Sequence, residues 1–197
     1  MGNPCPWEIR NAEASDIELI RSLCQRIWPA TYSQMLSAEQ LEYMMDWMYS
    51  PSSLLQQMKE GAQFLILYYK GADQQITKAP KMNQPASELA SELASEPASE
   101  PAGYASFQEI GDNHYKLHKL YVLPELQGLG AGRFFMEQII QKVSRAGGHS
   151  IELQVNRSNK AVGFYQRTGF RIIKEADFPI GNDYFMNDYI MQIDLKA

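Results

Sequence analysis

The chain has 197 residues, of which 45% are hydrophobic, and its formal net charge at pH 7 is −5. This length and apolar content suit a single globular domain with a sizeable core, so we expect residues 1–197 to form one domain. Four of the five excess negative charges come from Glu88, Glu92, Glu96 and Glu100, which leaves the rest of the chain close to neutral. A nearly neutral chain gives no sign of the basic surface that is typical of nucleic-acid-binding proteins, so we expect no nucleic-acid partner.

The apolar runs and the cysteines fit a cytoplasmic protein. No run reaches the roughly 18 apolar residues that a membrane-spanning helix needs, and Glu8 and Arg10 fall where a signal peptide requires an apolar core. Cys5 and Cys24 are too few for a disulfide framework. We therefore expect a cytoplasmic protein with no membrane partner. No metal is expected, because no Cys or acidic residue has metal-ligand spacing to the histidines His114, His118 and His149.

The N-terminal region begins with a strand and a helix. Trp7–Arg10 alternates apolar and polar residues, as a short strand does. Apolar residues then repeat at helical spacing over Ile17–Ile27. Ser15 and Glu18 have the spacing of a capping box at the start of this helix, and Pro29 is expected to end it.

Two further helices and a strand complete this half. Ser37 and Gln40 form a second capping box, and after a break at Pro51 a third helix is predicted to start at Ser52 and to end at Gly61. Phe64–Tyr69 has the continuous apolar character of a buried strand.

The segment 71–102 differs in composition from the rest. It is rich in Ala, Ser, Glu, Pro and Gln, and it contains Ala-Ser-Glu-Leu twice and Ala-Ser-Glu-Pro twice. Leu89 and Leu93 are spaced to share a helical face, but Pro97 and Pro101 prevent its extension. We expect an expanded flexible loop that joins two strands of one hairpin, and a partner-docking segment is the alternative.

The C-terminal half alternates strands and helices, which predicts a mixed sheet with helices on both faces. The expected strands are Tyr104–Ile110, Tyr115–Val122, Ile151–Val155, Phe170–Lys174 and Tyr189–Leu195. The expected helices run from Gly130 to about Ala146 and from a cap at Ser158 or Asn159 to Gly169.

The stretch from Leu120 to Arg133 is the most informative of the chain. An apolar strand-like run meets a proline, and a turn with glycines at 128, 130 and 132 opens into an amphipathic helix. Glycines leave no Cβ atoms to keep a ligand off the backbone. The first amides of a helix lack internal partners and carry the positive end of its dipole, so this pattern favours a phosphate or pyrophosphate site. The alternative is a tight strand-to-helix connection without a ligand.

The spacing of this loop excludes two classes of nucleotide site. A dinucleotide fold requires G-x-G-x-x-G, but counting from the first or second glycine places Arg133 or Phe135 at the third position. A nucleoside-triphosphate loop requires Gly-Lys-Ser/Thr, whereas Gly132 is followed here by Arg133 and Phe134. What remains is Q-x-x-G-x-G from Gln127 to Gly132, preceded by Leu-Tyr-Val-x-Pro-Glu.

This pattern resembles the acetyl-coenzyme A signature of the GNAT superfamily of N-acetyltransferases. A second block, Val155–Phe170, is similar to the N-x-x-A-x-x-F-Y-x-x-x-G-F pattern of the same family. The resemblance is close over 103–195 and looser over 7–70. It implies an α/β (α+β) GNAT fold, with a mixed, mostly antiparallel central sheet flanked by helices on both faces. More loosely, Tyr43–Ser50 and Asn187–Met191 resemble a branch that includes polyamine acetyltransferases.

The resemblance implies that acetyl-CoA is the co-substrate, with its pyrophosphate on the loop amides and its pantetheine arm along the strand edge. Arg133 is expected either to reach phosphate or to be a solvated helix residue. Asn159 is expected to contact the coenzyme, to cap a helix, or to do both. The cofactor-binding residues so implied are Leu120, Tyr121, Val122, Gln127, Gly128, Leu129, Gly130, Ala131, Gly132, Arg133 and Asn159.

Catalysis of acetyl transfer to an amine needs a proton acceptor and help for the departing thiolate. At pH 7 only about one lysine-like amine in 2,500 is unprotonated. Tyr165 matches the family tyrosine that points at the coenzyme sulfur, and packing on the inner face of its helix is the alternative role. Glu109 and His118 are candidates for the base, although each is also an ordinary strand or surface residue.

The expected reaction is direct attack by a primary amine of a small-molecule acceptor on acetyl-CoA in a ternary complex. Two alternatives stay open: a coenzyme A-binding regulatory protein without turnover, and a protein N-terminal or side-chain acetyltransferase. The sequence allows a homodimer. Several Met and aromatic residues crowd together after Ile27: Trp28, Tyr32, Met35, Tyr43, Met44, Trp47, Met48 and Tyr49. Most of them are expected in the core. The others are expected to line an acceptor pocket, together with Glu39, Glu42 and Asp46.

Overall fold

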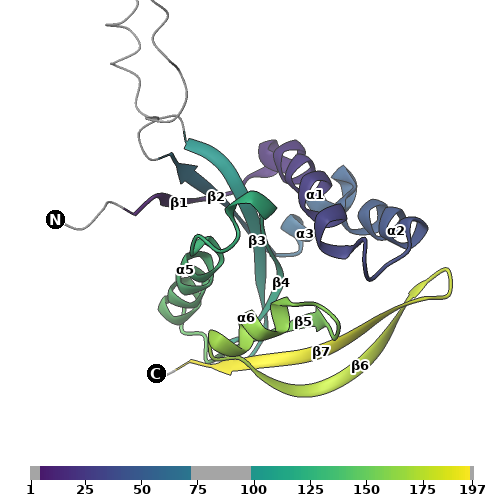
Figure 1. Cartoon of the computed structure of the whole chain (residues 1–197). Coiled ribbons are helices and arrows are strands. Elements are labelled where there is room, and N and C mark those ends of the chain that lie inside the picture. Colours follow the sequence, from purple (N-terminus) through teal and green to yellow (C-terminus); the bar gives the residue numbers. More distant parts are fainter. Residues whose placement is uncertain (1–4, 72–98, 196–197) are drawn as a thin grey trace, which may run out of the picture.

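The computed structural model describes residues 5–71 and 99–195 (Figure 1). Within these ranges seven strands form one sheet, in the order β1-β2-β3-β4-β5-β7-β6. Neighbouring strands are antiparallel, except that β4 and β5 are parallel. Helices cover both faces of the sheet (Figure 1). The predicted fold class and the predicted order of elements are confirmed.

The bounds of the elements agree with the predicted ones in the interior and differ at several ends. The N-terminal half contains β1 (Trp7–Asn11), the 3-10 helix η1 (Ala14–Asp16), α1 (Ile17–Tyr32), α2 (Ala38–Tyr49), α3 (Pro51–Lys59) and β2 (Gln63–Lys70). The C-terminal half contains β3 (Ser99–Gly111), β4 (His114–Val122), the 3-10 helix η2 (Pro124–Leu126), α5 (Ala131–Arg145), β5 (Ser150–Asn156), α6 (Ala161–Arg167), β6 (Arg171–Gly181) and β7 (Tyr184–Asp194).

Two apolar layers hold the helices to the sheet. On one face, α1 to α3 pack through side chains such as Ile20, Trp28 and Leu54, which are at most 2% exposed. On the other face, α5 contributes the fully buried Phe135 and Met136. Complete burial of side chains of this size stabilises the fold by about 1.5–3 kcal/mol each.

Helix α1 continues past Pro29, which the sequence analysis expected to end it. Proline removes one backbone donor, but the aromatic packing of the last turn offsets this loss. The rings of Trp28 and Tyr32 lie 5.0 Å apart, and the N–H of Ser33 donates to the Pro29 carbonyl (3.2 Å). The extra turn brings Tyr32 to the sheet.

The predicted cap of the first helix and the predicted start of the third helix were wrong. The capping box is formed by Glu13 and Asp16 and not by Ser15 and Glu18. Asp16 Oδ2 accepts from the backbone N–H of Glu13 (2.8 Å) at the start of η1. Ser50 replaces Ser52 at α3, since Pro51 occupies the first helical position, where its missing N–H costs nothing. The predicted cap at Ser37 is confirmed, and its Oγ accepts from the N–H of Gln40 (3.1 Å).

Strand β3 begins at Ser99, three residues before the expected end of the long loop at residue 102. Ser99 pairs with Lys70 and Pro101 with Tyr68, so the antiparallel ladder with β2 extends over the last repeat. The repeats between residues 72 and 98 lie outside the described residues.

The β6–β7 hairpin is longer than the two strands that the sequence predicted. It turns at Asn182 and Asp183, whose positive φ angles (49° and 57°) are typical of a type I′ turn. Most of β6 is exposed, because the hairpin extends beyond the core toward α2 (Figure 1). An exposed strand carries no clear apolar alternation, which is why the periodicity identified only its base.

Candidate active site

The loop between β4 and α5 leaves open space in front of a helix N-terminus. Gly128 and Gly130 have φ of 83° and 87°, and Gly130 is the residue that precedes α5. A Cβ placed on either glycine would meet nothing within 4 Å. The first helical hydrogen bond of α5 runs from the N–H of Phe134 to the Gly130 carbonyl (3.0 Å), so the preceding amides have no helical partner.

Strands β4 and β5 separate beside this loop. They pair only from His114 with Ser150 to Leu117 with Leu153. Beyond Leu117, β4 pairs with β3 alone, and its other edge borders a gap that widens toward the loop. The backbone groups of that edge are therefore available to a ligand that lies along it as an additional strand.

A β-bulge at His118 changes the direction of the side chains along β4. Phe107 pairs with Leu117 and Ser106 pairs with Lys119, so His118 is the extra residue. Leu117 and Leu120 consequently both pack on the α5 side of the sheet, whereas Tyr121 packs on the α1 side.

A cavity of about 1260 Å³ occupies the gap between the two strands. It extends from the glycine loop and α6 to α1, α2 and β7. Predicted site residues that line it are His118, Leu120, Tyr121, Val122, Gln127, Gly128, Gly130, Gly132, Arg133, Asn159 and Tyr165.

Three predicted site residues do not line this cavity. Glu109 is exposed near the β3–β4 turn, where its carboxylate accepts from the backbone N–H of Asn113 (3.3 Å). Leu129 is 59% exposed, and Ala131 is buried in the core beneath the loop. The position of Glu109 argues against the predicted role as a base, because the strand carries it toward the end of the sheet away from the gap.

Three of the predicted cofactor-binding side chains make local contacts. Asn159 Oδ1 accepts from the N–H of Ala161, the first residue of α6 (2.8 Å), although the N-cap position itself belongs to Lys160 and not to Ser158 or Asn159. Gln127 Nε2 donates to the Val122 carbonyl (3.2 Å). Arg133 Nε donates to Glu137 one turn along α5 (2.8 Å).

Tyrosines form the wall of the cavity next to α1. The hydroxyl groups of Tyr32 and Tyr121 lie 3.0 Å apart, and deeper in the core the hydroxyl of Tyr104 donates to that of Tyr49 (3.0 Å). Burial raises the pKa of all four phenols, that of Tyr32 to about 12. These groups therefore stay neutral over the physiological range.

Tyr165 reaches the same cavity from α6, on the opposite side of the gap. It is 9% exposed and packs against Phe164 and Phe170. Burial raises its pKa above that of a free tyrosine, so the hydroxyl keeps its proton as a hydrogen-bond donor. Tyr165 therefore packs in the core and also lines the cavity, so its position is compatible with both of its expected roles.

Asp188 on β7 is a residue of the cavity wall that the sequence analysis did not select. It is 5% exposed, and burial raises its pKa to about 6, although Arg157 and Lys116 oppose the shift. Its charge in turn contributes to the raised pKa of Tyr32. The only available signal was the loose resemblance over Asn187–Met191, because Asp188 precedes the predicted strand.

Lys119 is a second charged residue that the sequence analysis missed. It is 8% exposed, its Nζ donates to Gln57 (2.6 Å), and it lies over the rings of Tyr49 and Phe64. Burial lowers its pKa to about 8. The neighbouring His118 has a pKa lowered to about 4 by desolvation and by the charges of Lys119 and Lys116, which leaves it neutral at pH 7.

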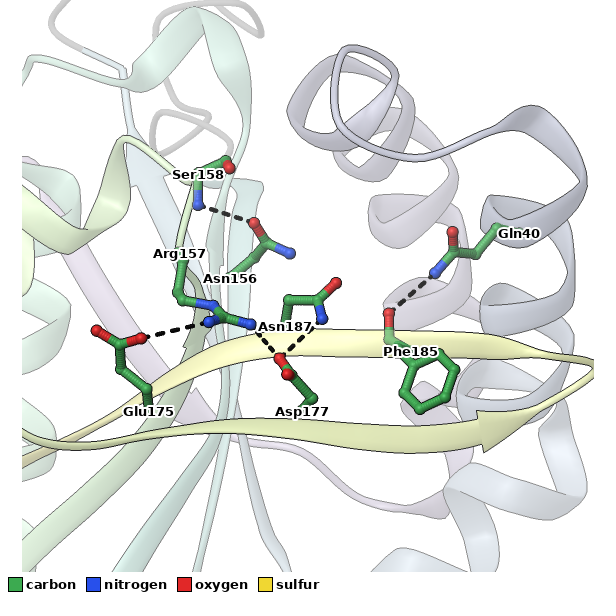
Figure 2. A network of polar contacts seen from close by, with 8 residues as sticks. All are labelled: Gln40, Asn156, Arg157, Ser158, Glu175, Asp177, Phe185 and Asn187. Atoms are coloured by element: carbon green, nitrogen blue, oxygen red, sulfur yellow. Dashed lines mark hydrogen bonds and ion pairs between the residues drawn. The ribbon is translucent and has the colours of Figure 1, made fainter.

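Ion pairs fix the strand that carries Asp188. Arg157, which directly follows β5, contacts Glu175 and Asp177 on β6, and Asn187 donates to the same Asp177 oxygen (2.8 Å) (Figure 2). The network ties both strands of the hairpin to the end of β5 and determines the position of the neighbouring Asp188.

The far end of the hairpin contacts α2. Gln40 Nε2 donates to the Phe185 carbonyl (3.3 Å; Figure 2), and the Tyr43 hydroxyl donates to the Ile180 carbonyl (2.6 Å). A second cavity of about 380 Å³ lies below this contact and shares lining residues such as Met35 and Phe185 with the first. The hairpin and α2 thus bound the side of the cavity opposite the loop between β4 and α5.

The predicted acceptor residues divide between cavity and surface. Those that line the cavity are Trp28, Tyr32, Met35, Met44, Met48 and Tyr49. Those that do not are Tyr43, Trp47, Glu39, Glu42 and Asp46. Helical spacing therefore identified the α2 residues that face the cavity, but the prediction also included α2 residues that do not line it.

Comparisons with known proteins agree with this geometry. Residues 71–179 match the acetyltransferase (GNAT) domain family. A stretch of 90 residues, 45% of this chain, is 36% identical to the "uncharacterized N-acetyltransferase Rv2669" of Mycobacterium tuberculosis and spans 57% of that relative. The chain thus spans little more than half the length of the curated relatives it matches.

Solved structures share the fold over nearly the whole chain. The PaiA N-acetyltransferase of Thermoplasma acidophilum, solved with coenzyme A, has a TM-score of 0.68 at 21% identity, covering 95% of this chain and 98% of its own. YncA of Salmonella typhimurium, solved with acetyl-CoA, has a TM-score of 0.58 at 17% identity, covering 97% and 95%. The chain belongs to the GNAT acetyltransferase family.

Within residues 5–71 and 99–195, no helix is long and apolar enough to cross a bilayer. In that part of the chain, no group of three or more His, Cys, Asp or Glu residues is arranged to hold a metal ion.

Proposed function

We propose that this protein transfers an acetyl group from acetyl-CoA to a primary amine of a small molecule. The observation that carries the proposal is the continuous cavity of about 1260 Å³, which joins the glycine loop to a wall with tyrosines and a carboxylate. One end has the open helix N-terminus that suits a pyrophosphate, and the other has groups that suit an amine.

The coenzyme end of the site fits acetyl-CoA. The open space at Gly128 and Gly130 lets phosphate oxygens approach the amides at the start of α5, where the helix dipole favours negative charge. The unpaired edge of β4 from Leu120 to Val122 offers backbone hydrogen bonds to an extended arm. When bound, acetyl-CoA would supply a thioester carbonyl that an amine can attack.

The residues around the gap would serve this reaction. A bond forms between the nitrogen of the neutral amine and the acetyl carbon, and the carbon–sulfur bond breaks. The nitrogen loses one N–H proton, and the sulfur leaves as a thiolate that takes up one proton. Tyr165 would donate a hydrogen bond to that sulfur. Because the pKa of Tyr165 is raised, complete proton transfer is unfavourable, and we assign it a stabilising hydrogen bond.

The acceptor end favours a small molecule over a folded protein. The β6–β7 hairpin is fastened to α2 by two hydrogen bonds to main-chain carbonyls, from Gln40 and Tyr43. A hairpin held in this way narrows the approach to the cavity, whereas a protein acceptor needs an open groove.

Two assays test the proposal. Isothermal titration should detect coenzyme A binding, and a free-thiol assay should then detect turnover of acetyl-CoA with members of a panel of small primary amines. Peptides with free N-termini or lysines serve as the comparison. Binding without turnover on either panel would favour the regulatory alternative, and turnover of peptides alone would favour protein acetylation. We also propose a single domain and a cytoplasmic location, and sedimentation of the purified protein would test a homodimer.

A further inference from the structure

Asp188 is a buried carboxylate that lacks a hydrogen-bond donor. It lies inside the sheet, paired with Asn156 on β5 and with Ala176 on β6. Its exposed fraction is 5%, and it lines the cavity. Within residues 5–71 and 99–195, no backbone or side-chain group donates a hydrogen bond to its oxygens.

The charged groups around Asp188 are engaged elsewhere. Arg157 binds Glu175 and Asp177, and Lys116 lies 3.9 Å from Glu152. Burial of a charged group without a partner is costly, and a ligand that donates hydrogen bonds removes part of that cost. The site therefore favours a cationic donor at this position.

Asp188 differs from the other acid of the cavity wall. Among the described residues, Glu137 and Asp188 are the acidic residues that line the cavity, and Glu137 is paired with Arg133 on α5. Asp188 lies instead near Tyr32, whose hydroxyl contacts Tyr121 on the splayed part of β4. A ligand on Asp188 would thus lie at the acceptor end of the cavity.

We propose that Asp188 binds the acceptor as an alkylammonium ion and accepts the proton that its nitrogen must lose before attack. This inference rests on the proposed acetyl transfer and names its acceptor class: primary alkylamines that are cationic at neutral pH. In the step, an N–H bond of the ammonium breaks and an O–H bond forms on Asp188. The electron pair left on nitrogen then forms the bond to the acetyl carbon, and the proton leaves Asp188 for the solvent.

The titration of Asp188 suits this role. With a pKa of about 6 it is mostly ionised at pH 7, yet it is a stronger base than an ordinary carboxylate. The titratable groups near it are Lys116, Arg157, Asp177 and Tyr32. An ammonium ion bound to Asp188 should lower its pKa, because an opposite charge favours the ionised form.

The binding test uses n-butylamine as the cationic probe and n-butanol as its neutral counterpart. Isothermal titration is performed on the full chain saturated with coenzyme A. We expect n-butylamine to bind and n-butanol not to bind. The affinity for n-butylamine should rise about tenfold between pH 5 and pH 8, because a carboxylate with a pKa of about 6 gains its charge in this interval.

Asp188→Asn should abolish this pH dependence. The matched control is Asp194→Asn on the same strand, which makes the same substitution at an exposed residue paired with Arg171. It should bind n-butylamine as the wild type does. Unchanged, pH-dependent binding by Asp188→Asn would overturn the proposal, and so would absence of n-butylamine binding in a wild-type protein that binds coenzyme A. Failure to bind coenzyme A would instead contradict the proposed function.

A measurement on the wild type keeps the proposal testable if Asp188→Asn folds poorly. Carbon-13 NMR of the wild-type carboxyl groups should show that n-butylamine lowers the apparent pKa of Asp188, and an unchanged value would contradict the assignment. For a variant that folds, kcat/KM with n-butylamine should fall about 10²-fold or more at pH 7 and recover toward pH 10, where the amine loses its own proton. A loss that is equal at every pH would indicate a structural role.

Discussion

The hydroxyl groups of Tyr32 and Tyr121 lie 3.0 Å apart and join the last turn of α1 to the splayed part of β4. Both side chains line the cavity, and burial keeps both protonated. This contact forms because α1 continues through Pro29 and because the bulge at His118 directs Tyr121 toward α1. The end of the cavity that we propose for the acceptor thus has a neutral tyrosine wall with Asp188 beside it.

Gly130→Ala should weaken coenzyme A binding by about tenfold or more. Its φ of 87° is unfavourable for alanine, and the added Cβ would occupy the space that we assign to phosphate. Gly147→Ala is the matched control, since Gly147 follows α5 with a φ of 84° and also has open space around it. Both variants should lower the melting temperature similarly. Isothermal titration checks the prediction, and equal coenzyme affinities of the two variants would remove the loop from the coenzyme site.

Tyr165→Phe should lower kcat about 10²-fold while leaving coenzyme A affinity nearly unchanged. The substitution keeps the ring that packs on Phe164 and Phe170 and removes only the hydroxyl. Tyr69→Phe, on a half-buried ring that packs against Trp7, is the control and should retain wild-type turnover. Steady-state kinetics distinguish the outcomes: wild-type turnover by Tyr165→Phe would restrict Tyr165 to packing.

Lys119→Met should stabilise the protein by about 1 kcal/mol or more at pH 7, because it removes a buried charge. The pKa of Lys119 falls from 10.5 to about 8 on folding. Below pH 8 the amine is protonated in both states, and its burial opposes folding. Between about pH 8 and 10.5 the unfolded state binds more protons, so wild-type stability gains from this group as pH rises.

Urea unfolding across this pH range measures the effect. The difference in unfolding free energy between Lys119→Met and wild type should shrink as pH rises from 8 to 10.5. Because this is a difference between two proteins, the titration of all other groups cancels. Lys142→Met, at a partly exposed lysine of α5 that contacts Asn11, is the control and should show no such trend. A constant difference at all pH values would mean that Lys119 is not desolvated as the structure implies.

Removal of residues 86–98 should leave the melting temperature within a few degrees and acetyl transfer intact. Lys70 and Ser99 are paired on neighbouring strands, so a shorter connection can still join β2 to β3. Each doubling of loop length costs only about 0.6 kcal/mol, and shortening therefore changes stability little. The cut stops before Ser99 because that residue belongs to β3. Lost activity in a deletion variant with a normal melting temperature would assign a function to the repeats.

Local signals in the sequence determined the half of the cavity that we propose for the coenzyme. Glycine spacing, the following helix and the apolar strand before it lie within Leu120–Arg133, so short-range geometry alone predicted an anion site there. The same holds for Tyr165, whose place on the inner face of α6 follows from helical periodicity. Such features depend on neighbours in the chain and can be read from it.

The half of the cavity that we propose for the acceptor was decided only by the tertiary structure. One extra residue at His118 reverses the side-chain alternation of β4, and it directs Lys119 into the core beneath α1. Asp188 becomes a buried, unpartnered carboxylate because β7 lies between β5 and β6, while Glu109 is carried away from the gap. Burial and charge pairing arise between segments far apart in the sequence, and residue type or spacing along one strand does not specify them.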